Sequence, residues 1–253
     1  MRSLLFSCLT VCVALAMSCT AAFGQTTINV DFNGSNGSGT FSGVGAAPDA
    51  GTIWNAVVPP NNPFTSGPLV DSTGAATAVT VSLTTNYLEY AANERPAAFA
   101  PALLTDFVYQ TVLGPNGPAS GFAINNLTPG GAYNLYFYAQ NGGYSNTATS
   151  FTIGSDVKIA TNAPGGFGPA SFIENTNYVV FSGIVADGTG VIAGSFNDVA
   201  VANNAAFNGL QIQQVPIPEP ASIASVVIGG GLLLVGGMIR RRRAAGTAKQ
   251  VSL

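Results

Sequence analysis

The sequence predicts an all-β protein whose main domain is an antiparallel β-sandwich with one short helix. Three observations lead to this class. Apolar and polar residues alternate with a period of two between residues 25 and 214, where the helical period is almost absent. Val, Phe and Tyr are abundant there. Turn-forming Gly, Pro, Asn and Asp separate the short apolar runs, as expected for a sandwich of about eight or nine strands.

The predicted strands follow this alternation along the chain. They are residues 28–32, 79–83, 122–127, 133–139, 150–153, 178–185, 191–196 and 206–213. The segment 133–139 has the clearest pattern, because Leu135 and Phe137 share one face while Tyr136 and Tyr138 share the other. We therefore expect the first of these faces to point into the core.

The connections between strands are predicted from turn residues. The turns at residues 128–131 and 187–188 are expected to close hairpins. Residues 57–63 contain three prolines and are expected to form a rigid loop within one domain. Residues 101–109 are the exception to the strand pattern, because proline at a first helical turn and the apolar residues after it predict the short helix.

The N-terminus has the pattern of a secretory signal peptide, predicted to span residues 1–24. Arg2 supplies the positive start, residues 4–17 are apolar, and small residues precede the expected cleavage site before Gln25. A lipoprotein signal cleaved before Cys19 is the alternative. All the cysteines of the chain lie in this segment, so the mature protein is expected to form no disulfide. They are Cys8, Cys12 and Cys19.

Residues 215–243 have three parts in a fixed order. Alternate prolines hold the first part extended, since proline lacks an amide hydrogen. The uncharged run 221–239 is 19 residues long. As a transmembrane helix it would span about 28 Å, close to the thickness of bilayer hydrocarbon. A stop-transfer cluster follows and predicts a cytoplasmic tail at 244–253. It consists of Arg240, Arg241, Arg242 and Arg243.

This tail resembles the PEP-CTERM sorting signal of bacteria that make exopolysaccharide. The sorting motif consists of Pro218, Glu219, Pro220, Ala221 and Ser222. The resemblance implies that signal peptidase and a membrane protease-transpeptidase called exosortase process the protein, the latter cutting near the proline-glutamate-proline site. It therefore implies a transient membrane anchor. An ordinary span that is never cut is the alternative.

Two further resemblances concern the main domain. Residues 127–135 are similar to the tyrosine-corner approach of fibronectin type III domains, where a tyrosine hydroxyl bonds the backbone a few residues upstream. Residues 28–32, 133–138 and 207–212 look like parts of galactose-binding and malectin-like carbohydrate modules. The second resemblance implies a jelly-roll fold, and a fold by itself does not fix a function.

Composition excludes several classes of site. The chain has no histidine, which removes the histidine-based activation of a nucleophile. Without cysteine, the mature protein offers no zinc-thiolate site. Residues 25–219 contain all 11 acidic residues and only Arg95 and Lys158 as basic ones, so their net charge is −9. This balance disfavours nucleic acid and favours neutral glycans, cations or a cationic partner.

Carboxylates are the remaining candidates for catalysis or metal binding. A glycosidase pair would come from Glu89, Glu94, Asp106 and Glu174. Nothing in the sequence pairs them, so solvated charges or ion pairs are the alternative. The aspartate turns 71–74 and 187–190 offer oxygen ligands to a structural calcium ion, although turn formation explains both. No other cofactor is predicted.

Exposed aromatic side chains are the predicted ligand-binding residues. Tyr136 and Tyr138 share a strand face, and Tyr144 and Trp54 are their candidate companions. Such rings stack on sugars while their polar tips form hydrogen bonds. The alternative is that the tyrosine pair packs under the short helix or a long loop, and that Trp54 fills the core.

These features predict an exported surface or extracellular-matrix protein that is structural, adhesive or glycan-binding and is not an enzyme. Its expected partners are the two processing enzymes, the membrane and an extracellular polysaccharide, with no nucleic acid. A secreted polysaccharide-degrading enzyme that uses the carboxylates is one rival hypothesis. A scaffold subunit that binds another protein is the other.

Overall fold

The computed structural model describes most of the predicted sandwich. The described residues are 26–33, 39–48, 50–59, 63–84, 88–92, 101–111, 119–141, 147–161, 171–199 and 204–216. Nearly all of them belong to one compact unit, Gln25–Val215. The predicted signal peptide, Glu94, Tyr144 and residues 217–253 of the tail lie outside the described residues. Within the described stretches, no helix has the length and hydropathy that a membrane crossing needs.

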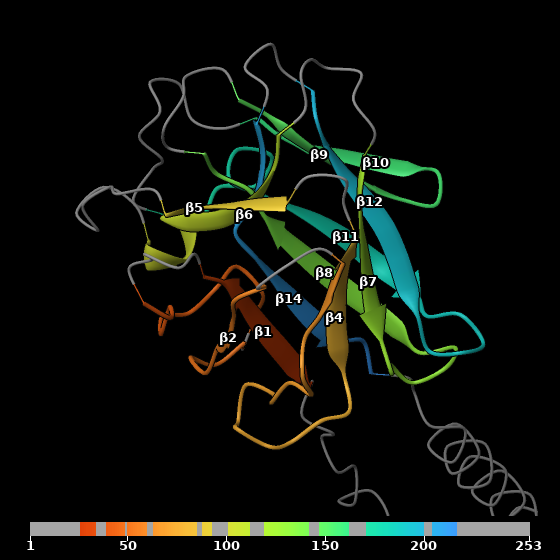
Figure 1. Ribbon diagram of the computed structural model, residues 1–253. Coiled ribbons are helices and arrows are strands. Elements are labelled where there is room, and N and C mark those ends of the chain that lie inside the picture. The colour runs from red at the N-terminus through yellow and green to blue at the C-terminus, as the bar shows by residue number, and fades with distance from the viewer. Residues whose placement is uncertain are drawn as a thin grey trace, which may run out of the picture. The chain divides into compact units, whose positions relative to one another are not determined.

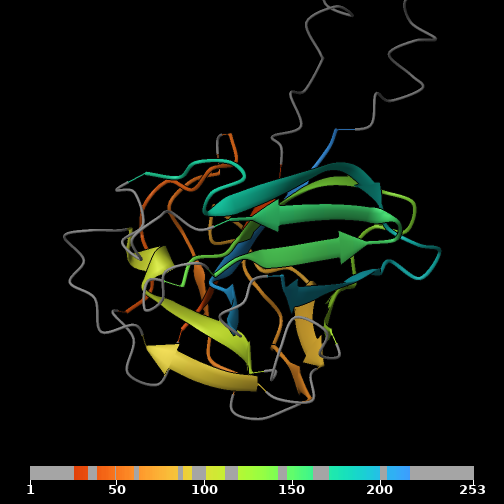
Figure 2. The ribbon, with the colours of Figure 1, turned by 90° about the horizontal axis from the view of Figure 1, so that it is seen from above.

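Two larger sheets form the sandwich, and a smaller sheet accompanies them (Figures 1 and 2). The five-stranded sheet has the order β11 (Tyr178–Val185), β8 (Ala132–Tyr138), β14 (Gly209–Gln214), β1 (Thr27–Phe32), β2 (Asn55–Val57). The six-stranded sheet has the order β10 (Asp156–Ala160), β9 (Thr149–Ile153), β12 (Ile192–Asp198), β7 (Ser120–Asn125), β4 (Thr80–Thr84), β3 (Phe64–Thr65). The three-stranded sheet has the order β13 (Asn204–Phe207), β6 (Asp106–Thr111), β5 (Leu88–Ala92).

The predicted fold class is confirmed. Neighbouring strands pair antiparallel throughout these sheets, except that β1 and β2 are parallel. The alternation in β8 has the expected result, since Leu135 and Phe137 enter the apolar core while Tyr136 and Tyr138 belong to a second cluster. Because successive side chains of a strand point to opposite faces, this second cluster lies on the outer face of the five-stranded sheet.

The two turns predicted as hairpins are corners that connect different sheets, so that prediction was wrong. Residues 128–131 lead from β7 to β8, and residues 187–188 lead from β11 to β12. The two corners bind each other, because the Leu127 N–H donates to the Gly190 carbonyl at 2.9 Å. Gly190 has a φ of +79°, and a Cβ there would overlap the Leu127 carbonyl oxygen. Hairpins and corners need similar turn residues, so the local sequence does not separate them.

Polar side chains stabilise the turns through hydrogen bonds to the backbone. Asp187 Oδ1 accepts the Thr189 N–H at 2.8 Å and the Val191 N–H at 2.9 Å, and Asp71 makes the equivalent bonds in its own turn. Turn formation by aspartate is therefore confirmed at both positions. Tyr133 Oη accepts the Thr128 N–H at 2.9 Å, which confirms the hydrogen bond expected from the tyrosine corner.

The short helix is present but is shorter than predicted. A 3-10 helix, η1 (Ala102–Leu104), gives way to strand β6 within the segment predicted to be helical. The residues after Thr105 pair with β5 on one side and with β13 on the other. The sequence Asp-Phe-Val-Tyr is rich in aromatic and β-branched side chains, so its strand preference adds to these two ladders.

Candidate functional site

An aromatic cluster covers part of the outer face of the five-stranded sheet. Tyr136 and Tyr138 come from β8, and Tyr178 begins β11, the edge strand beside it. The centroid of the Tyr178 ring lies 6.5 Å from that of Tyr136 and 5.9 Å from that of Tyr138. Phe172, Phe41 and Trp54 complete the cluster through edge-to-face contacts. We call these six residues the aromatic face.

A cover segment, residues 39–48 and 50–54, packs on the other half of this sheet face. Polar side chains of β1 and β14 hold its backbone. Asn29 Nδ2 donates to the carbonyls of Ala50 and Ile53 at 2.8 and 2.9 Å. Gln211 Oε1 accepts the Ala47 N–H at 2.9 Å. These bonds replace the water that outward-facing polar residues would otherwise bind, so Asn29 and Gln211 are fully buried.

The cover segment buries two of the predicted ligand-binding residues. Tyr138 is fully buried, donates its hydroxyl hydrogen to Gln211 Oε1 and accepts the Ala46 N–H at 2.6 Å. Trp54 donates its indole N–H to the Gly43 carbonyl at 2.9 Å and is 7% exposed. The prediction of exposure was wrong for both, and neither ring is available to stack on a ligand. The alternatives are confirmed for both, because Tyr138 packs under a long loop, the cover segment, and Trp54 is buried in a hydrophobic cluster with Leu103.

Tyr178 is the accessible ring of the aromatic face, and the ring of Tyr136 lies buried beside it. Tyr136 is 9% exposed and Tyr178 is partly exposed. Their rings are tilted by 32° to each other. Within the described part of the chain neither hydroxyl has a hydrogen-bond partner, in contrast to the hydroxyls of Tyr133 and Tyr138. Partial burial and the nearby Glu174 carboxylate raise the pKa of both phenols, so both hydroxyls remain protonated donors at neutral pH.

The candidate catalytic carboxylates lie in different environments. Glu174 is exposed and forms a β-bridge with Tyr178. Asp106 is fully buried at the start of β6. Glu89 lies in β5, and its side chain is outside the described part. The structure therefore does not bring Asp106 and Glu174 together as an exposed pair.

A second buried carboxylate, that of Asp31, contacts the cover segment. Asp31 in β1 accepts the Phe41 N–H at 2.7 Å and is fully buried. Burial raises the pKa of Asp31 to about 8, the Phe41 hydrogen bond opposes this effect, and the Asp106 charge adds to it. Among the described residues, no group of three or more acidic side chains gathers in a way that could hold a metal ion.

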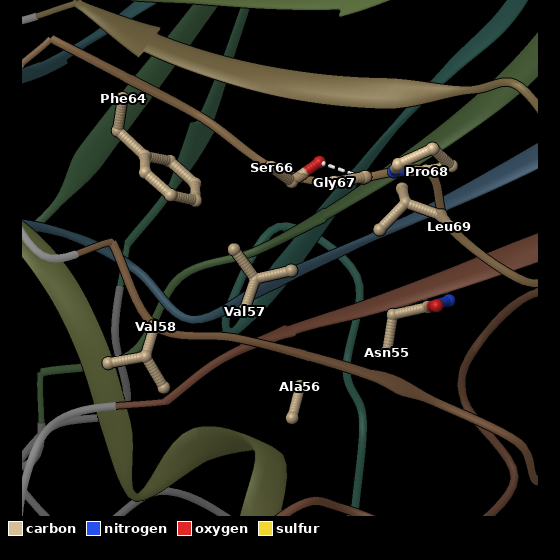
Figure 3. Close-up of a pocket in the computed structure, with 9 residues that line it drawn as sticks. All are labelled: Asn55, Ala56, Val57, Val58, Phe64, Ser66, Gly67, Pro68 and Leu69. Atoms are coloured by element: carbon tan, nitrogen blue, oxygen red, sulfur yellow. Dashed lines mark hydrogen bonds between the residues drawn. The ribbon is translucent and has the colours of Figure 1, made fainter.

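A hollow of about 310 Å³ opens at one side of the sandwich (Figure 3). It lies between β2, the edge of one large sheet, and β3, the edge of the other. Asn55 uses its amide to bind the Asn29 and Val70 backbone, and the Ser66 hydroxyl bonds the Gly67 carbonyl and the Val81 N–H. These polar side chains already have partners, so the hollow reflects a gap between two sheet edges. Its lining residues are Asn55, Ala56, Val57, Val58, Phe64, Ser66, Gly67, Pro68 and Leu69.

No family model and no curated protein matches this chain. Several solved structures are partly similar. The enzymatically active domain of tailspike protein 4 from bacteriophage CBA120 has 19% identity and a TM-score of 0.30, covering 54% of this chain and 19% of that one. The CBM22-1–GH10 modules of Clostridium thermocellum endo-1,4-beta-D-xylanase 10B, complexed with xylohexaose, have 10% identity and a TM-score of 0.30. They cover 55% of this chain and 27% of their own.

A third similar structure is TmCBM61 in complex with beta-1,4-galactotriose. It has 12% identity and a TM-score of 0.24, and covers 54% of this chain and 83% of its own. The last two structures are complexes with an oligosaccharide. The chain spans less than a third of the tailspike and xylanase chains.

Sequence reasoning missed Tyr178 as a member of the site. The alternation predicts that Tyr178 begins a strand, but it does not show which strand lies beside it. β11 pairs with β8 through residues about 40 positions apart in the chain, as in Tyr178↔Tyr138. The available signal was the alternation of residues along this strand, which puts Tyr178 on the same face as Val180 and Ser182. The structure shows that all three are at least partly exposed.

Proposed function

We propose that this is an exported surface or matrix protein whose sandwich binds a glycan at the aromatic face without turning it over. One observation supports glycan binding at this face. Tyr178 presents a partly exposed ring beside the buried ring of Tyr136, and the protonated hydroxyls of both have no partner in the described part of the chain. Rings of this kind cover the apolar face of a sugar while the hydroxyl groups bind its polar edge.

The positions of the carboxylates oppose turnover of a bound polysaccharide. A glycosidase of the common kind needs two acids that flank the same bond, within about 10 Å of each other. Glu174 is exposed next to the aromatic face, whereas Asp106 is buried in β6. Neither Asp31 nor Asp106 is accessible to a polysaccharide, because both are fully buried.

Binding at this face is tested with the mature protein and a panel of neutral oligosaccharides. Changing Tyr178→Ala is expected to weaken binding at least about tenfold, because it removes one stacking ring and one donor. Val185→Ala is the matched control, since Val185 is exposed at the opposite end of β11. Isothermal titration measures the affinity, and reducing-sugar release measures turnover. Equal loss in both variants, or release of sugar, would contradict the proposal.

The tail is proposed to anchor the protein only until exosortase cuts it near the sorting motif 218–222. The support is the order of the proline strip, the uncharged run and the arginine cluster in the sequence. In cells with an active exosortase, mass spectrometry of the mature protein is expected to show a C-terminus near this motif. A mature chain that still carries Arg240 to Arg243 would show that no processing takes place.

A further inference from the structure

A negative charge lies beside Tyr178 and has no ion-pair partner in the described part of the chain. Glu174 forms a β-bridge with Tyr178, which places the carboxylate-bearing residue next to one ring of the pair. Its side chain is exposed and makes no ion pair within the described part of the chain. Burial raises the pKa of Tyr178, and the Glu174 charge adds to this effect, in keeping with the β-bridge between the two residues.

The wider surroundings reinforce this negative charge. The described part of the chain has Lys158 as its one basic residue, and Lys158 makes no ion pair there. Residues 25–219 together carry a net charge of −9. A polyanion such as a uronic acid polymer is therefore repelled from this face, whereas a cationic ligand is attracted to it.

We propose that the Tyr136–Tyr178–Glu174 face selects glycans that carry free amino groups over their neutral and acidic counterparts. The inference rests on the proposed glycan binding and adds the chemical class of the sugar. A sugar ammonium group binds a carboxylate through charge-assisted hydrogen bonds. The face of the partly exposed Tyr178 ring also attracts a cation, through the negative charge of its π-system. The same three residues thus provide stacking, hydrogen bonding and the counter-charge.

The test compares two oligosaccharides that differ only in acetylation, together with an acidic one. The full-length protein in detergent is titrated at pH 5.5 and low salt with a glucosamine hexasaccharide, with its N-acetylated form and with an oligogalacturonate. We expect the glucosamine oligomer to bind about fivefold or more tightly than the acetylated one. We also expect the oligogalacturonate to bind most weakly of the three.

Two variants that have the same net charge show whether the preference for the amino sugar depends on Glu174. Glu174→Gln is expected to remove the preference for the amino sugar while leaving the affinity for the acetylated oligomer within about twofold. Asp156→Asn also removes one exposed carboxylate, but on β10, and is expected to keep the preference. Equal loss in both variants would assign the preference to overall charge and overturn the proposal. Tighter binding of oligolysine than of the amino sugar would overturn it as well.

The outcomes also separate this inference from the proposed function. If the acetylated and free-amine oligomers bind equally well, glycan binding stands and the selection for amino groups is wrong. If none of the oligosaccharides binds, glycan binding at this face is wrong and the selection falls with it.

Discussion

Replacing Phe137 with alanine is expected to lower the free energy of unfolding by about 3–5 kcal/mol. Phe137 in β8 is fully buried between the sheets. Its ring lies 4.9 Å from that of Phe151 in β9, 5.0 Å from that of Phe122 in β7 and 5.7 Å from that of Phe207 in β13. The cavity left by alanine would therefore loosen contacts among all three sheets at one point.

Denaturant unfolding followed by fluorescence or circular dichroism measures this change. The midpoint is expected to fall while the slope stays the same, because the surface exposed on unfolding barely changes. Val157→Ala on β10 is the control, since Val157 is 57% exposed and its loss is expected to change stability by less than about 0.5 kcal/mol. A loss below about 1 kcal/mol for Phe137→Ala would mean that the sheets do not share this core.

The free energy of unfolding is expected to decrease as the pH rises from about 4 to about 8, because of Asp31. Burial raises the pKa of Asp31 in the folded protein to about 8, whereas an unfolded aspartate titrates near 3.9. Below pH 4 both states are protonated and the full stability is present. Between the two pKa values the unfolded state releases the proton first, so stability falls by up to about 1.4 kcal/mol per pH unit. Above pH 8 this loss is complete.

Asp31→Asn tests this assignment. The asparagine keeps an oxygen that accepts the Phe41 N–H but carries no titratable group, so the variant is expected to lose most of the slope between pH 5 and pH 8. Asp187→Asn is the control. The Thr189 hydroxyl holds the pKa of Asp187 below its usual value, so Asp187 stabilises the fold above that range and loses this contribution only as the pH falls. If the slope persists in Asp31→Asn, another group causes it.

The strands could be predicted because their alternation is local. Residues 178–185 coincide with β11, and Ile28, Val30 and Phe32 enter the core from β1 as expected. The predicted strand at 206–213 is divided by Asn208, whose amide donates to the Asp106 carbonyl at 2.7 Å. That bond joins positions about a hundred residues apart, so no local pattern shows it.

The site was predicted only in part because its exposure depends on the cover segment. Tyr136 and Tyr138 have the same place in the alternation, yet Tyr138 is fully buried and bonds the backbone of the cover segment, whereas Tyr136 is 9% exposed. The one signal in the sequence was chemical. The outward positions of β1 and β14 include Asn29, Gln211 and Gln213, which are uncharged and can be buried once backbone groups bind them.

The position of β14 affects when the protein can fold. The last strand of the sandwich lies between β8 and β1, and Gln213 pairs with Thr27 at the start of the domain. A nascent chain that ends before Gly209 lacks the strand that joins these two halves of the sheet. The five-stranded sheet therefore closes only after the ribosome has passed residue 214, so the chain stays open until its final strand has been made.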